Sequence, residues 1–127
     1  MAANISSLDI LIVDDHDPMR AILEKALRAA GASVVRGAED AGQALALLAE
    51  RPADLVIADL MMPGMDGLAF VAALRADARL AHARIVMITG YANVADEART
   101  AGADVVLLKP ITPAELLAAV ETALTQH

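Results

Sequence analysis

Short apolar runs alternate with longer amphipathic stretches along the whole chain. Runs of four to six residues rich in Ile, Val and Leu, separated by helical patterns, are typical of buried parallel strands. The pattern predicts four such strands and a weaker one in second place, each followed by a helix. In chain order the runs are Leu8 to Val13, Ser33 to Val35 (the weaker one), Leu55 to Ala58, Ile85 to Ile88 and Val105 to Leu108.

The predicted helices carry end signals of several kinds. An Asp-Pro step, a lone Asp and a Thr-Pro-Ala-Glu capping box mark three helix starts, and glycines close two helices. The order of elements is therefore (βα) repeated five times. In chain order the signals are Asp17-Pro18 (with Asp17 as the expected N-cap), Gly31, Asp40, Gly102 and Thr112 to Glu115.

Five successive βα units predict an α/β fold with one five-stranded parallel sheet. Because β-α-β crossovers are right-handed in nearly all proteins, the helices should cover both faces of a doubly wound sheet. The expected strand order is 2-1-3-4-5, with the reversal between the first and third strands. A length of 127 residues fits a single domain over 1–127, with its core at about 8–125.

Polar residues follow four of the predicted strands. Asp14 and Asp15 end the first, Asp59 the third, Thr89 the fourth and Lys109 the fifth. Ligands of open α/β sheets bind at this carboxyl edge, where the strand order reverses. The three carboxylates should therefore converge in one crevice.

Three converging carboxylates repel one another unless a cation lies between them, and oxygen-rich sites with few protein ligands suit Mg²⁺. A bound Mg²⁺ also neutralises charge on a transferring phosphoryl group. Lys109 can pair with phosphoryl oxygens, and Thr89 can donate a hydrogen bond to them. One carboxylate then remains to act as a nucleophile.

Composition excludes several other functions. Ten Lys and Arg against 17 Asp and Glu give a net charge of −7, which disfavours nucleic acid as a partner. The absence of Cys removes thiolate chemistry and suits a cytoplasmic location. Although 57% of the residues are hydrophobic, thirty are Ala and no apolar run approaches the roughly 18 residues of a membrane span. The first residues lack the basic and apolar regions of a signal peptide, so no membrane association is expected.

The motifs Asp14-Asp15, Asp59 to Gly67, Thr89-Gly90 and Lys109-Pro110 resemble, in order, those of the receiver domain of bacterial two-component response regulators. The resemblance covers essentially the whole chain and implies the flavodoxin-like (βα)5 fold. It implies a signalling switch and not an enzyme. Because no residues remain for an output domain after the predicted fifth helix, we expect this switch to stand alone. Such a switch accepts a phosphoryl group from the phosphohistidine of a histidine kinase or histidine phosphotransfer protein. Its output passes to a downstream protein, which the sequence does not identify, or through a phosphorelay.

The resemblance also assigns roles to single residues. Asp59 is implied as the phosphoacceptor. Asp15 and Asp59 would bind Mg²⁺ directly, the backbone carbonyl of Met61 would be the third protein ligand, and Asp14 would act through water. Thr89 and Lys109 would hold the phosphoryl oxygens.

The resemblance implies a cis peptide at Lys109-Pro110 and reveals one departure. Receivers commonly carry an aromatic residue three positions before the lysine, where this chain has Val106. Tyr91, the only tyrosine, lies two residues after Thr89. We hypothesise that Tyr91 replaces the missing aromatic switch.

A surface for the phosphodonor is predicted beside the crevice. Apolar residues begin the first and fifth helices, where the resemblance places the partner's helix. The alternative is that Ile22 belongs to the core and the others fill gaps between loops. The residues concerned are Pro18, Met19, Ile22, Ile111 and Pro113.

Three other functions remain open. The chain could be the receiver segment of a larger hybrid kinase or regulator. It could be a receiver that acts as a scaffold without phosphorylation, although every expected site residue is present. A metal-dependent aspartyl phosphatase is disfavoured, because such enzymes place a second Asp two residues after the nucleophile and position 61 is Met.

Overall fold

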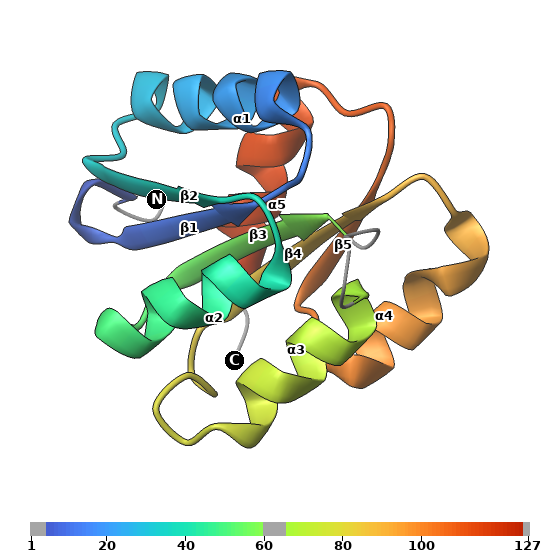
Figure 1. Cartoon of the computed structure of the whole chain (residues 1–127). Coiled ribbons are helices and arrows are strands. Elements are labelled where there is room, and N and C mark those ends of the chain that lie inside the picture. The colour runs from blue at the N-terminus through green and yellow to red at the C-terminus, as the bar shows by residue number, and fades with distance from the viewer. Residues whose placement is uncertain (1–4, 60–65, 126–127) are drawn as a thin grey trace.

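The computed structural model describes residues 5–59 and 66–125, and they form an α/β sandwich around one parallel sheet (Figure 1). The strand order is β2-β1-β3-β4-β5, which confirms the predicted topology. The five strands are β1 (Asp9–Val13), β2 (Val34–Ala38), β3 (Leu55–Asp59), β4 (Arg84–Thr89) and β5 (Val105–Leu108).

Helices cover both faces of this sheet. The helices α1 and α5 pack on one face, and α2, α3 and α4 pack on the other (Figure 1). Their bounds are α1 (Asp17–Ala29), α2 (Ala41–Glu50), α3 (Gly67–Ala76), α4 (Ala95–Ala101) and α5 (Pro113–Thr125), with short 3₁₀ turns η1 (Ile5–Ser7) and η2 (Ala92–Val94).

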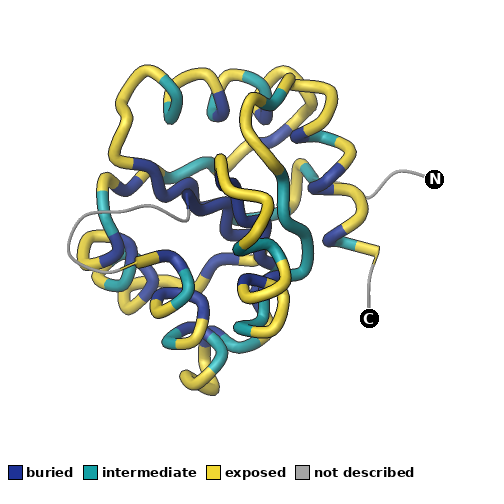
Figure 2. The backbone as a smooth tube through the Cα atoms, turned by 90° about the vertical axis from the view of Figure 1, so that its right-hand side faces the viewer, coloured by how far each residue is buried: buried dark blue, intermediate teal, exposed yellow. Residues whose placement is uncertain are grey.

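The central strands are buried on both sides, as near-continuous apolar runs predict for parallel strands (Figure 2). Side chains alternate between the two cores: in β1, Leu11 and Val13 face α2 to α4, whereas Ile10 and Ile12 face α1 and α5. The edge strands β2 and β5 are more exposed. The carboxyl ends of β1 and β3 thus belong to the deeply buried centre of the sheet.

Two sequence predictions need correction. The second strand runs over Val34–Ala38 and not Ser33 to Val35, because pairing with β1 extends it through Arg36 and Gly37, which lack an apolar signature. The N-cap of α1 is His16 and not Asp17, since the His16 side chain accepts a hydrogen bond from the Met19 N–H at 3.3 Å.

The other helix-end signals are confirmed. Thr112 and Glu115 form a reciprocal capping box with two hydrogen bonds of 3.1 Å, and Asp40 caps α2. Gly31 and Gly102 end α1 and α4 with φ of 112° and 126°, a region that favours glycine. Within the described residues, no helix is both long and apolar enough to cross a bilayer.

Candidate functional site

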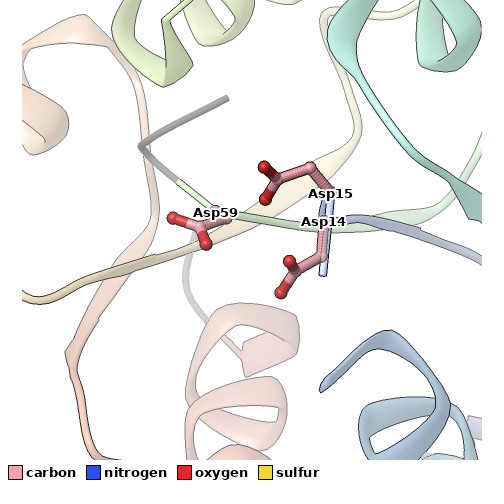
Figure 3. Close-up of side chains that lie close together, drawn as sticks. All are labelled: Asp14, Asp15 and Asp59. Carbon is pink, nitrogen blue, oxygen red and sulfur yellow. The ribbon is translucent and has the colours of Figure 1, made fainter. Parts of the chain in front are cut away.

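Three carboxylates meet at the ends of β1 and β3 (Figure 3). One oxygen each from Asp14, Asp15 and Asp59 lies within 4.8 Å of the others. Asp14 and Asp59 are buried, and Asp15 is exposed. The predicted convergence is confirmed, and it follows from the reversal of strand order between β1 and β3.

The electrostatics of this cluster favour a cation. Burial raises the pKa of Asp14 above its ordinary value of 3.8. Four smaller contributions act on the same pKa. The hydrogen bond from the His16 N–H and the charge of Lys109 lower it, and the charges of Asp59 and Asp15 raise it. Ionisation of Asp14 therefore costs more free energy in the folded protein than in the unfolded chain, and a cation beside the cluster would offset that cost.

Lys109 brings a positive charge into direct contact with the carboxylates. Its Nζ lies 2.8 Å from Asp59 Oδ2, so the fifth strand contributes to the site as predicted. Burial alone would lower the pKa of Lys109, but the hydrogen bond and charge of Asp59, with the charges of Asp14 and Asp15, outweigh it and raise the pKa above 10.5. One ammonium group faces three carboxylates, which leaves a net negative site.

Backbone hydrogen bonds tie the site loops to the sheet. Asp14 N–H donates to Ala38 O at 3.0 Å, and Lys109 N–H donates to Thr89 O at 2.8 Å. The Lys109-Pro110 peptide is cis, which confirms that expectation. The loops carrying Asp14 and Lys109 are thus anchored directly at their first residues.

Thr89 is buried at the end of β4, and its Oγ1 accepts a hydrogen bond from the Tyr91 N–H at 3.1 Å. Tyr91 itself is 54% exposed, and Val106 packs partly buried against the core on the α2 to α4 side. Met61, the expected third metal ligand, lies outside the described residues.

Sequence reasoning missed the contact of Arg20 with the Asp14 loop and the part that Gly37 plays in it. Arg20 Nη1 donates to Asp14 O at 2.6 Å, and Gly37 leaves room for the Arg20 side chain. An isolated glycine within a strand often marks the close approach of another group, but Gly37 lies beyond the end of the predicted second strand, so this signal became readable only with the structure.

Comparison with known proteins places this fold and site in a family. The family model described as the response regulator receiver domain matches residues 10–121. The chemotaxis protein CheY-3 of Vibrio cholerae is 38% identical over 112 residues, which are 87% of this chain and 86% of that protein. The phosphate regulon transcriptional regulatory protein PhoB of Pseudomonas aeruginosa is 35% identical over 117 residues, 91% of this chain but 51% of PhoB.

Solved structures agree. The chemotaxis response regulator CheY4 of Vibrio cholerae superposes with a TM-score of 0.85 at 32% identity, over 91% of this chain and 97% of that chain. The chain belongs to the response regulator receiver domain family, and its fold is CheY-like. Receiver domains act as signalling switches and bind Mg²⁺ at an acidic aspartate cluster. The three carboxylates described above fit such a site, because they offer hard oxygen ligands to one point.

Proposed function

We propose that this protein is a Mg²⁺-dependent phosphorylation switch that accepts a phosphoryl group on Asp59. The observation that carries the proposal is the meeting of Asp14, Asp15 and Asp59 within 4.8 Å, with Lys109 bonded to Asp59. Asp59 is the member of the cluster that lies on β3, between the two Asp of the β1 loop and Lys109 of β5. A phosphoryl group on Asp59 would therefore lie between the metal ligands and the ammonium group.

The proposed transfer is a displacement at phosphorus. An Asp59 oxygen forms the new O–P bond while the N–P bond of the donor phosphohistidine breaks, and its electron pair returns to the imidazole nitrogen. Asp14 and Asp15, with Asp59, would hold Mg²⁺, which when bound neutralises charge on the phosphoryl oxygens. Lys109 would exchange its bond to Asp59 for one to a phosphoryl oxygen, and the Thr89 hydroxyl would donate to another.

Intact mass after incubation with acetyl phosphate and Mg²⁺ tests this function. We expect one phosphoryl adduct that disappears in Asp59→Ala and when Mg²⁺ is chelated. Asp66→Ala is a matched control, because Asp66 caps α3 and is not part of the carboxylate cluster. An adduct that persists in Asp59→Ala would refute the assignment, and no adduct on the folded native protein would favour a scaffold.

A small groove between α1 and α5 supports a docking surface for the phosphodonor. It has a volume of about 110 Å³, and four of the five residues predicted from sequence line it: Met19, Ile22, Ile111 and Pro113. Ile22 is 55% exposed, so the alternative that it belongs to the core is wrong. We propose that a helix of a histidine kinase or phosphotransfer protein packs here.

Ile22→Ala should slow phosphotransfer from a protein donor and leave the reaction with acetyl phosphate unchanged. Val34→Ala is the control, because Val34 is an exposed apolar residue on the edge strand β2, outside this groove. Equal slowing with both donors would contradict the docking role.

The exposed end of β4 and β5 supports an output surface. Tyr91 and Leu108 are both about half exposed, and both are linked to Thr89, one by a hydrogen bond and the other by strand pairing. We propose that movement of Thr89 on phosphorylation is transmitted to Tyr91, in place of an aromatic residue at 106.

Amide hydrogen exchange over residues 92–108, measured with and without acetyl phosphate and Mg²⁺, tests this role. The phosphorylation-dependent change should shrink in Tyr91→Ala and persist in Tyr91→Phe, which keeps the ring. An unchanged response in Tyr91→Ala would eliminate Tyr91 as the switch.

Whether the switch acts alone is part of the proposal. CheY-3 is matched over 86% of its length, whereas PhoB is matched over 51%. The matched domain therefore makes up most of one relative and about half of the other. We propose a stand-alone cytoplasmic receiver over residues 1–127 that signals through contacts with another protein.

A further inference from the structure

The loop that carries Asp14 and Asp15 is held by a side chain of α1. Arg20 Nη1 donates to the backbone oxygen of Asp14 at 2.6 Å, and Arg20 Nη2 contacts Asp17 Oδ1 at 2.5 Å. The Arg20 side chain is only 19% exposed. Its guanidinium therefore bridges the peptide that joins the two acids and the first residue of α1.

The hydrogen bond from Arg20 acts on the peptide unit between the two candidate metal ligands. The Asp14 N–H is held by Ala38 O and the Asp14 carboxylate by the His16 N–H at 2.8 Å. Arg20 holds the remaining polar group of Asp14, its carbonyl oxygen. Because the Asp14 carbonyl and the Asp15 N–H share one plane, fixing that oxygen also fixes the start of Asp15.

This restraint matters more for the position of the Asp15 carboxylate than for that of the Asp14 carboxylate, which has a hydrogen bond of its own. The Asp15 carboxylate is exposed and makes no hydrogen bond or ion pair with any residue among 5–59 and 66–125. Among these described residues, the backbone of the loop is therefore what restrains the Asp15 carboxylate relative to Asp14 and Asp59.

Gly37 provides the space in which Arg20 lies. A Cβ added at Gly37 would stand 3.2 Å from Arg20 Cδ and 3.3 Å from Nε, closer than ordinary van der Waals contact. The φ of Gly37 is not positive, so the backbone itself would accept Ala. The absence of a side chain at 37 therefore serves the approach of Arg20 and not an unusual turn.

We propose that Arg20 is a positioning residue for the metal site and that Gly37, which has no side chain, leaves the space that Arg20 occupies. Arg20 holds the Asp14-Asp15 peptide in the orientation that brings the Asp15 carboxylate to the cluster. This inference rests on the Mg²⁺ binding proposed above. A partner that only orients a ligand typically changes metal affinity by 10- to 100-fold, and we expect about a tenfold effect because the bond is to backbone.

Isothermal titration of the metal-free protein with Mg²⁺ tests the proposal in three variants. Arg20→Lys keeps the positive charge but lacks the planar guanidinium, whose two nitrogens contact the Asp14 carbonyl and Asp17, and it should bind Mg²⁺ about tenfold more weakly. Gly37→Ala keeps Arg20 but displaces it, and it should also weaken binding. The double variant should bind no more weakly than Arg20→Lys, because both changes disturb one contact.

Arg28→Lys is the matched control. Arg28 lies on the same helix and also bonds to backbone oxygens, those of Ser33 and Val35, at the opposite end from the site. The Arg28→Lys variant should bind Mg²⁺ with the affinity of the native protein. Thermal unfolding without metal, measured for each variant, separates a loss of affinity from a loss of fold.

Each other outcome has a defined meaning. Unchanged affinity in both folded single variants would overturn the positioning role. A fourth variant, Arg20→Ala, removes the positive charge. Unchanged affinity in Arg20→Lys together with tighter binding in Arg20→Ala would show that Arg20 acts only as a repelling charge, which also overturns the positioning role. If the native protein itself bound no Mg²⁺, the proposed function would fail, independently of Arg20.

Discussion

The repulsion within the carboxylate cluster should make the metal-free protein less stable than a variant with one charge removed. Asp14→Asn is the appropriate change, because Asn keeps the shape of the side chain and its Oδ1 can still accept the hydrogen bond from the His16 N–H. Asp14 is only 2% exposed, so solvent screens its charge poorly.

The size of the effect follows from the spacing. Two unit charges 4.8 Å apart repel by about 3.5 kcal/mol at an effective dielectric constant of about 20 and by about 1 kcal/mol in water. Asp14 has two negative neighbours, Asp15 and Asp59, and one compensating Lys109, so the net penalty is roughly that of one pair. We expect Asp14→Asn to raise the free energy of unfolding by about 1 to 3 kcal/mol at pH 7, or Tm by about 4 °C per kcal/mol.

Urea unfolding followed by circular dichroism in EDTA measures this difference. Because the folded pKa of Asp14 is raised above 3.8, its stabilising contribution is present below that value and is lost as the pH rises through the folded pKa. The advantage of Asp14→Asn should therefore grow with pH and then level off. Saturating Mg²⁺ should reduce it, since metal at 100 times Kd adds about 2.7 kcal/mol to the native protein.

The control for this experiment is Asp96→Asn, because the Asp96 side chain is 99% exposed and lies on α4. Its stability should match that of the native protein within about 0.5 kcal/mol. If Asp14→Asn were equal to or less stable than the native protein in EDTA, the cluster would not be repulsive and the argument for a cation there would lose its electrostatic basis.

Three further changes test other parts of the structure. Lys109→Met should reduce the loss of stability above pH 10.5. A raised Lys pKa stabilises the fold below pH 10.5, and the contribution is lost as pH rises through the folded pKa, so urea unfolding between pH 10 and 12 measures the difference. Thr112→Ala should lower stability by about 1 kcal/mol through loss of the α5 capping box, and thermal unfolding would show no such loss if the box were unimportant. Gly102→Ala should cost more than 1 kcal/mol by the same measurement, because φ is 126° and the new Cβ would lie 2.7 Å from Arg75 Cγ; a neutral result would mean that the turn relaxes freely.

The fold was predictable because its signals are local and agree with one another. The central strands are continuous apolar runs, and the capping box at Thr112 lies where α5 begins. The second strand extends beyond its predicted end because β2 is an edge strand, in which Arg36 and Gly37 are accommodated without a second buried face. Pairing with β1, a tertiary effect, determines where that strand ends.

The candidate site was only partly predictable, because sequence shows which side chains reach the sheet edge and not how they are held there. The convergence of the aspartates followed from strand order alone. The bridge from Arg20 to the Asp14 carbonyl joins a side chain to a backbone atom across a space left by Gly37, and no residue type uniquely encodes such a contact.

The charge balance of the site links the proposed chemistry to the fold. The Lys109 ammonium group is bonded to Asp59, and the Lys109 backbone N–H is bonded to Thr89 O. A phosphoryl group adds up to about two negative charges, so in the proposed mechanism the ammonium must leave the carboxylate for the phosphoryl oxygens. Because β4 and β5 are tied together at Thr89 and Lys109, the proposed exchange would act on the strand ends that carry Tyr91 and Leu108. A change in charge at Asp59 would then become a change at an exposed surface, which is the physical requirement of a switch that signals by contact.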